Sequence, residues 1–107
     1  MTKLLLLVMT LAMSTTTATA APLSWSQVAA LPQPVAGEKM AYGPAPQQFG
    51  ELRLPSGEGR FPVVVLVHGG CWLAEYDYRY FNHLADALTA QGVATWTIEY
   101  RRIGDEG

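Results

Sequence analysis

The sequence is poor in residues that would hold a small protein together covalently or bind a metal ion. Its 107 residues include one cysteine, Cys71, and two histidines, His68 and His83. A single cysteine excludes an intrachain disulfide framework. The cysteine and the two histidines do not have the spacing of a metal-ligand set. We therefore expect no structural metal and no cofactor.

Charge is also scarce. Only 15% of the residues are charged, seven Lys and Arg stand against nine Asp and Glu, and the formal net charge is −2. No run of Lys or Arg is present, so we expect no nucleic-acid partner. Half of the residues are hydrophobic, which is typical of a globular protein rather than a disordered one.

The sequence has no apolar run of the roughly twenty residues that span a bilayer. The run from Leu4 to Met13 is interrupted by Thr10, follows the charge of Lys3, and leads to small residues at Ala18 and Ala20. This pattern is typical of a secretory signal peptide. We predict that residues 1–20 are removed and that the mature protein is exported, to the periplasm or the medium, without a membrane anchor.

Residues 21–48 are rich in proline, alanine, glycine and glutamine, which predicts an extended N-terminal segment. Ser24 and Gln27 have the spacing of a capping box, so one short helical turn over Val28 to Leu31 is expected. Glu38 to Tyr42 is predicted to form a short strand.

Two further strands are predicted before the middle of the chain. Phe49 to Leu54 alternates in polarity, which indicates a half-buried antiparallel strand near the edge of a sheet, with Leu52 and Leu54 on the apolar face. Pro62 precedes the valine-rich run Val63 to Val67, which predicts a strand buried on both faces.

A helix and another strand complete the pattern. Asp77 is a suitable helix cap and Gly92 a suitable helix end, and between them apolar residues recur at helical spacing, namely Tyr80, Phe81, Leu84, Ala85 and Leu88. Val93 to Tyr100 is rich in β-branched residues. Strand, helix and strand form a parallel βαβ unit. The predicted fold class is therefore α/β, with antiparallel leading strands followed by a βαβ unit.

The valine-rich strand ends in His68-Gly69-Gly70-Cys71-Trp72. Glycines allow a tight turn and leave backbone N–H groups unobstructed by side chains. Ligands of parallel sheets bind at the carboxyl ends of strands, and bare amides there are suited to negative charge. We therefore take these residues as the candidate site.

This loop, with the strands and helix around it, resembles the oxyanion-hole loop of the α/β-hydrolase superfamily, in particular its exported esterase, lipase and prolyl-oligopeptidase-like branch. The resemblance implies that the N–H groups of Gly70 and Cys71 stabilise an oxyanion. It also implies that His68 and Gly69 shape the loop and that Trp72 contacts the substrate. The substrate would be a small ester or another acyl or peptidyl compound, hydrolysed by a serine enzyme.

The nucleophile motif of that family, Gly-x-Ser-x-Gly, is not present in this sequence. Residues 49–107 would then be the N-terminal part of an incomplete hydrolase domain, without nucleophile, acid or catalytic histidine, and inactive by itself. We expect such a chain to expose the flank of Val63 to Val67. The sequence predicts no particular oligomeric state.

Three alternatives remain at this stage. Cys71 would be a thiol nucleophile if His68 or His83 served as its base, although a small residue beside the glycines explains Cys71 without reactivity, and His83 is expected on the solvated side of the helix. Glu99 and the glycines loosely resemble a dinucleotide-binding unit, but the Gly-x-Gly-x-x-Gly pattern is absent. The third alternative is a small exported binding module without catalysis.

Overall fold

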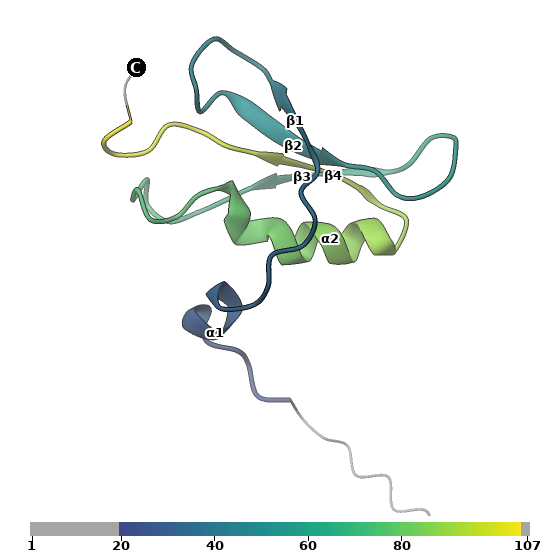
Figure 1. Ribbon diagram of the computed structural model, residues 1–107, viewed down its shortest axis with the longest axis horizontal. Coiled ribbons are helices and arrows are strands. Elements are labelled where there is room, and N and C mark those ends of the chain that lie inside the picture. The colour runs from purple at the N-terminus through teal and green to yellow at the C-terminus, as the bar shows by residue number, and fades with distance from the viewer. Residues whose placement is uncertain (1–19, 106–107) are drawn as a thin grey trace, which may run out of the picture.

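The computed structural model of the chain describes residues 20–105 (Figure 1). The predicted signal peptide, residues 1–20, lies outside the described residues except for Ala20. None of the helices within residues 20–105 combines the length and the apolar character needed to cross a bilayer.

One four-stranded mixed sheet organises the structure. The strands are β1 (Glu38–Ala41), β2 (Phe49–Arg53), β3 (Val63–Val67) and β4 (Ala94–Ile98), in the spatial order β1-β2-β4-β3. Strand β2 is antiparallel to both of its neighbours, and β3 is parallel to β4. The predicted α/β class, the antiparallel leading strands and the parallel βαβ unit are confirmed.

Two α-helices accompany the sheet. Helix α1 (Trp25–Ala29) begins at Ser24, whose capping box with Gln27 is formed as predicted, although the helix starts three residues earlier than expected. Helix α2 (Asn82–Ala90) packs on one face of the sheet, whereas α1 lies on the same side at a distance from it (Figure 1).

The predicted helix after Asp77 is divided into two parts. A 3-10 helix, η1 (Tyr78–Phe81), precedes α2, and the Asp77 side chain accepts a hydrogen bond from the backbone N–H of Arg79. This bond caps the tight turn rather than an α-helical one. Gly92 has a positive φ of 84°, as expected for the residue that follows a helix.

The expectation that β3 is buried on both faces was wrong. Within residues 20–105, this strand pairs with β4 alone and forms an edge of the sheet, so it is not buried on both faces. Val63, Val65 and Val67 are 60%, 58% and 55% exposed, and only Leu66 of this strand is buried. A run of valines specifies an apolar strand but not the number of its neighbours. The expected exposure of this flank is confirmed.

The two faces of β2 are also reversed relative to expectation. Glu51 and Arg53 are almost fully buried, whereas Leu54 is 60% exposed. The two charged side chains form an ion pair of 2.7 Å, and the Arg53 guanidinium also donates to the carbonyl of Val35. Alternation correctly indicated two different faces, but it did not show that the charged residues pair with each other and lie inside.

Candidate functional site

The carboxyl ends of β3 and β4 lie side by side because these strands are parallel. The loop after β3 and the segment after β4 meet beyond the sheet (Figure 1). The backbone N–H of Ile103 donates to the carbonyl of Trp72 over 2.8 Å, which joins the two segments directly.

His68 is the first residue after β3 and is only 2% exposed. Its Nε2 lies 2.7 Å from Oε1 of Glu99, and its Nδ1 lies 3.0 Å from the carbonyl oxygen of Gly69. A carbonyl oxygen accepts hydrogen bonds only, so Nδ1 carries a hydrogen. Nδ1 is thus engaged within the loop and Nε2 by Glu99 after β4, so neither ring nitrogen is available to a substrate proton.

Glu99 is the partner that the sequence analysis did not assign to the site. It is 3% exposed and accepts hydrogen bonds from the backbone N–H groups of Tyr100, at 2.9 Å, and Tyr78, at 3.3 Å. Its own carbonyl accepts from the Tyr42 hydroxyl at 2.6 Å. A single carboxylate therefore ties together the loop after β3, the start of η1 and the end of β4. The sequence did contain a sign of this role, because Glu99 is an acidic residue that directly follows the largely apolar strand β4.

Tyr100, which is half-buried, packs against this pair. Its ring stacks on the imidazole of His68 with centroids 4.2 Å apart and planes at 8°, and its hydroxyl donates to the His68 carbonyl. Removal from water raises the pKa of Tyr100 above its ordinary value, and the Glu99 charge acts in the same direction. The phenol is therefore kept as a hydrogen-bond donor.

The glycine loop contains three consecutive residues with positive φ: Gly70 at 111°, Cys71 at 52° and Trp72 at 58°. The N–H of Leu73 donates to the Gly70 carbonyl over 2.9 Å, which closes a turn with Cys71 and Trp72 at its centre. Positive φ is costly for a tryptophan, about 1–3 kcal/mol. Strain of this kind is concentrated at functional sites.

The two glycines of the loop differ in their surroundings. A Cβ atom on Gly70 would come within 2.5 Å of Cβ of Tyr76, whereas a Cβ atom on Gly69 would meet no atom within 4 Å. Within residues 20–105, no hydrogen bond is donated by the amide of Gly70 or Cys71. The loop therefore presents two unengaged amides next to open space at Gly69.

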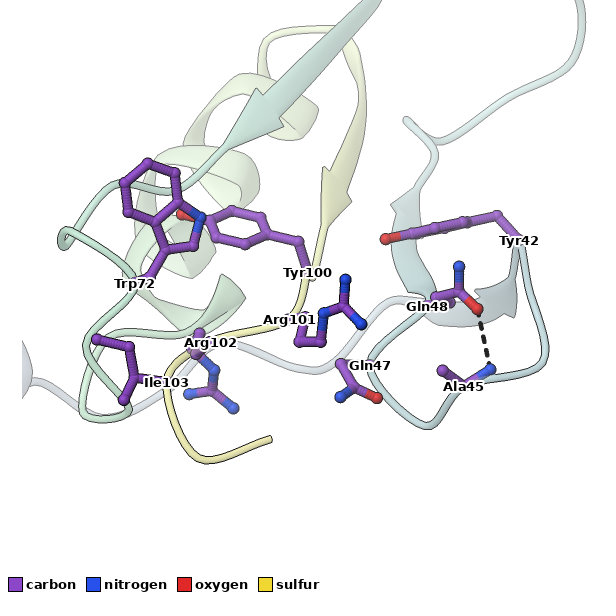
Figure 2. A pocket seen from close by; sticks show the side chains of 9 residues that line it. All are labelled: Tyr42, Ala45, Gln47, Gln48, Trp72, Tyr100, Arg101, Arg102 and Ile103. Atoms are coloured by element: carbon purple, nitrogen blue, oxygen red, sulfur yellow. Dashed lines mark hydrogen bonds between the residues drawn. The ribbon is translucent and has the colours of Figure 1, made fainter. Parts of the chain in front are cut away.

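Two cavities adjoin this loop. The first, of about 670 Å³, is lined by Trp72, Tyr100 and residues of the 42–48 and 101–103 segments, most of them polar (Figure 2). The second, of about 480 Å³, is lined by residues 69–71 together with Trp25, Leu73, Tyr76 and Tyr80. The structure thus places Trp72 on one cavity and the candidate amides of Gly70 and Cys71 on another.

The alternative of a thiol nucleophile receives no geometric support. Cys71 is free and exposed, and among the described residues no hydrogen bond joins it to His68 or His83. His83 is half-buried, and its Nε2 is shielded from solvent without a hydrogen-bond partner, so the expectation of a solvated ring was wrong. Across residues 20–105, no group of three His, Cys, Asp or Glu side chains is placed to hold a metal ion.

Comparisons with known proteins give one informative match. No family model and no curated protein matches the chain. A solved structure of a candidate thioesterase from Silicibacter sp. TM1040 is similar, with a TM-score of 0.52 and 32% sequence identity. The similarity covers 63% of this chain and 25% of that one, so the chain spans about a quarter of the length of the matched protein.

These findings overturn the resemblance to the α/β-hydrolase superfamily. No family model supports it, and the solved structure that matches is described as a thioesterase. A short motif specifies a local turn at the end of a strand, and the same turn can occur in different folds, so His68 to Trp72 did not suffice to identify the family. The supported conclusion is a small α/β domain with a likeness to one candidate hydrolase.

Proposed function

We propose that this chain forms part of a hydrolase that acts on an acyl thioester or a carboxylic ester. The observation that carries the proposal is the strained turn at Gly70 to Trp72, which leaves the Gly70 and Cys71 amides unengaged beside a cavity. The likeness to a candidate thioesterase supports the same class of reaction.

In this proposal, the carbonyl oxygen of the substrate lies against the amides of Gly70 and Cys71. When a nucleophile attacks the carbonyl carbon, that oxygen becomes anionic and the two N–H groups stabilise it. One such donor is worth a factor of about 100–1000 in turnover. The buried His68–Glu99 pair holds the loop in the required shape, and no nucleophile is assigned to the described residues.

The proposed substrate is a small uncharged acyl compound, and the proposed location is outside the cytoplasm, as the predicted leader indicates. Trp72 lines the other, more polar cavity together with Arg102. In this proposal, Trp72 therefore contacts the leaving group rather than the acyl group. We propose neither a cofactor nor a nucleic-acid partner.

The test compares two proteins, the longest product of the coding sequence that contains residues 21–107 and residues 21–107 alone. Each is incubated with matched butanoyl substrates, a thioester and a nitrophenyl ester, and release of thiol or nitrophenol is followed by absorbance. We expect turnover by the longer product. Absence of hydrolysis of both substrates by that product would refute the proposal, and turnover of the ester alone would reject the thioester as substrate.

A further inference from the structure

Helix α1 has no buried residue, so it adds nothing to the core beneath the sheet. Helix α1 is held against the rest of the structure by the side chain of Trp25. The Trp25 ring stacks on Tyr80 with centroids 4.5 Å apart and planes at 23°, and it lies 6.2 Å from the Tyr76 ring. The segment that follows α1 is anchored by the Asn82 side chain, which donates to Gln33 over 2.9 Å. These contacts fix Trp25 next to the glycine loop.

Trp25, Tyr76 and Tyr80, here called the aromatic wall, line the cavity of about 480 Å³ together with residues 69–71 and Leu73. Among residues 20–105, no charged side chain lines this cavity. Its volume lies within the range of about 300–1,000 Å³ that is usual for small-molecule sites. Two of the aromatic rings remain partly open to the cavity and solvent, since Trp25 and Tyr80 are each 42% exposed.

We propose that the aromatic wall binds the apolar acyl group of the substrate and that Trp25 makes the N-terminal segment a determinant of acyl-chain specificity. The inference rests on the proposed function, because it takes Gly70 and Cys71 as the place of the carbonyl oxygen. A carbonyl oxygen held there directs the attached carbon chain into the adjoining space, and the lining of that space is apolar. Aromatic faces next to bare amides suit an uncharged alkyl or phenyl chain.

The first part of the test varies the length of the acyl chain of a ligand. Mature protein, in the longest available product, is titrated with the N-methyl amides of acetic, butanoic, hexanoic and octanoic acids, which resemble the substrate but resist hydrolysis. Binding is followed by tryptophan fluorescence and by protection of Cys71, which is exposed in the same cavity, from iodoacetamide. We expect affinity to rise about fourfold for each methylene until the cavity is filled, as burial of about 0.8 kcal/mol per methylene implies.

The second part of the test substitutes Trp25. Trp25→Ala should weaken binding of the N-methyl amide of hexanoic acid at least tenfold, whereas Trp25→Phe should keep most of the wild-type affinity. Leu31→Ala is the matched control, because Leu31 lies in the same segment and is equally exposed but does not line the cavity. Far-ultraviolet circular dichroism verifies folding of each variant.

The outcomes separate this inference from the proposed function. Affinity independent of chain length, or wild-type binding by Trp25→Ala, would overturn the role of the aromatic wall. Length-dependent binding with protection of Cys71 but without any ester or thioester hydrolysis would support the wall and refute the hydrolase.

Discussion

Nε2 of His68 lies 2.7 Å from Oε1 of Glu99, and both side chains are almost completely buried. The two residues are the first to follow parallel strands β3 and β4, so the pair joins the two strand ends on which the candidate site is built. A buried carboxylate is stable only when it is paired and hydrogen-bonded, and Glu99 accepts from the backbone N–H groups of Tyr78 and Tyr100 and contacts Nε2 of His68. The geometry of the glycine loop therefore depends on a residue thirty-one positions away.

Replacement of Glu99 tests that dependence. Glu99→Gln keeps the size of the side chain but removes the carboxylate that the backbone N–H groups of Tyr78 and Tyr100 face, so we expect a loss of about 1.5–3 kcal/mol in the free energy of unfolding, measured in urea. Nitrogen chemical shifts of the imidazole provide a second measurement. In the wild type, Nδ1 of His68 should carry hydrogen, and an Nδ1 without hydrogen would contradict the assigned bond to Gly69.

The two loop glycines form a matched pair for substitution. Gly70→Ala should destabilise the fold by about 1–3 kcal/mol, because its φ is 111° and the new methyl group would collide with Tyr76. Gly69→Ala meets no neighbouring atom, so its effect on stability should stay within about 0.5 kcal/mol.

In the proposed hydrolase, Gly69→Ala should nonetheless reduce turnover at least tenfold, because the methyl group would occupy the space through which a substrate approaches. Turnover at the wild-type level would show that substrate does not pass over Gly69. Thermal unfolding of both variants serves as the control for folding.

Because Glu51 and Arg53 form a buried ion pair, we expect the effects of replacing them on the free energy of unfolding to be strongly coupled. Glu51→Leu alone should cost about 3–5 kcal/mol, because it removes the buried partner of the guanidinium and leaves the exposed carboxylate of Asp86, 3.9 Å away, as its counter-charge. The double variant Glu51→Leu with Arg53→Met should be more stable than that single variant. A double-mutant cycle in urea measures the coupling, and additive effects of the two changes would show that the pair contributes nothing specific.

Strand β3 predicts self-association. Its outer edge is unpaired in the described residues, and Val63, Val65 and Val67 are exposed, which makes it a template for pairing with another strand. Val65→Lys should raise the monomer fraction of residues 21–107, as measured by light scattering after gel filtration. Met40→Lys on the opposite edge strand, β1, is the control. An equal effect of both variants would mean that charge alone, and not the β3 edge, controls association.

Asp77 predicts a pH dependence of stability. Burial alone would raise the pKa of this carboxyl, but the hydrogen bonds and the charge of Arg79 outweigh burial and hold the pKa below its ordinary value of 3.8. A lowered pKa in the folded state means that the stabilisation is present above about pH 4 and is lost as the pH falls further. Urea unfolding from pH 7 to pH 3 should show the stability difference between wild type and Asp77→Asn shrinking below pH 4. A constant difference across this range would contradict the role of the carboxylate.

Local features were predictable from the sequence because they depend on neighbours along the chain. The capping box at Ser24, the turn cap at Asp77, the left-handed Gly92 and the parallel βαβ unit all follow from residue type and short spacing. The expectation that the flank of β3 would remain exposed was also correct, since a single βαβ unit has too few elements to cover it.

Contacts between segments far apart in the sequence were decided by the tertiary structure alone. The position of β3 at an edge depends on which strands pair, and the burial of Glu51 and Arg53 depends on which face α2 covers. The partnership of His68 with Glu99 and the placement of Trp25 beside the glycine loop bring together residues that no local pattern connects. The sequence determined the shape of each element, because that shape is set by backbone preference and periodicity. The candidate site required packing, because its parts come from five separate stretches of the chain.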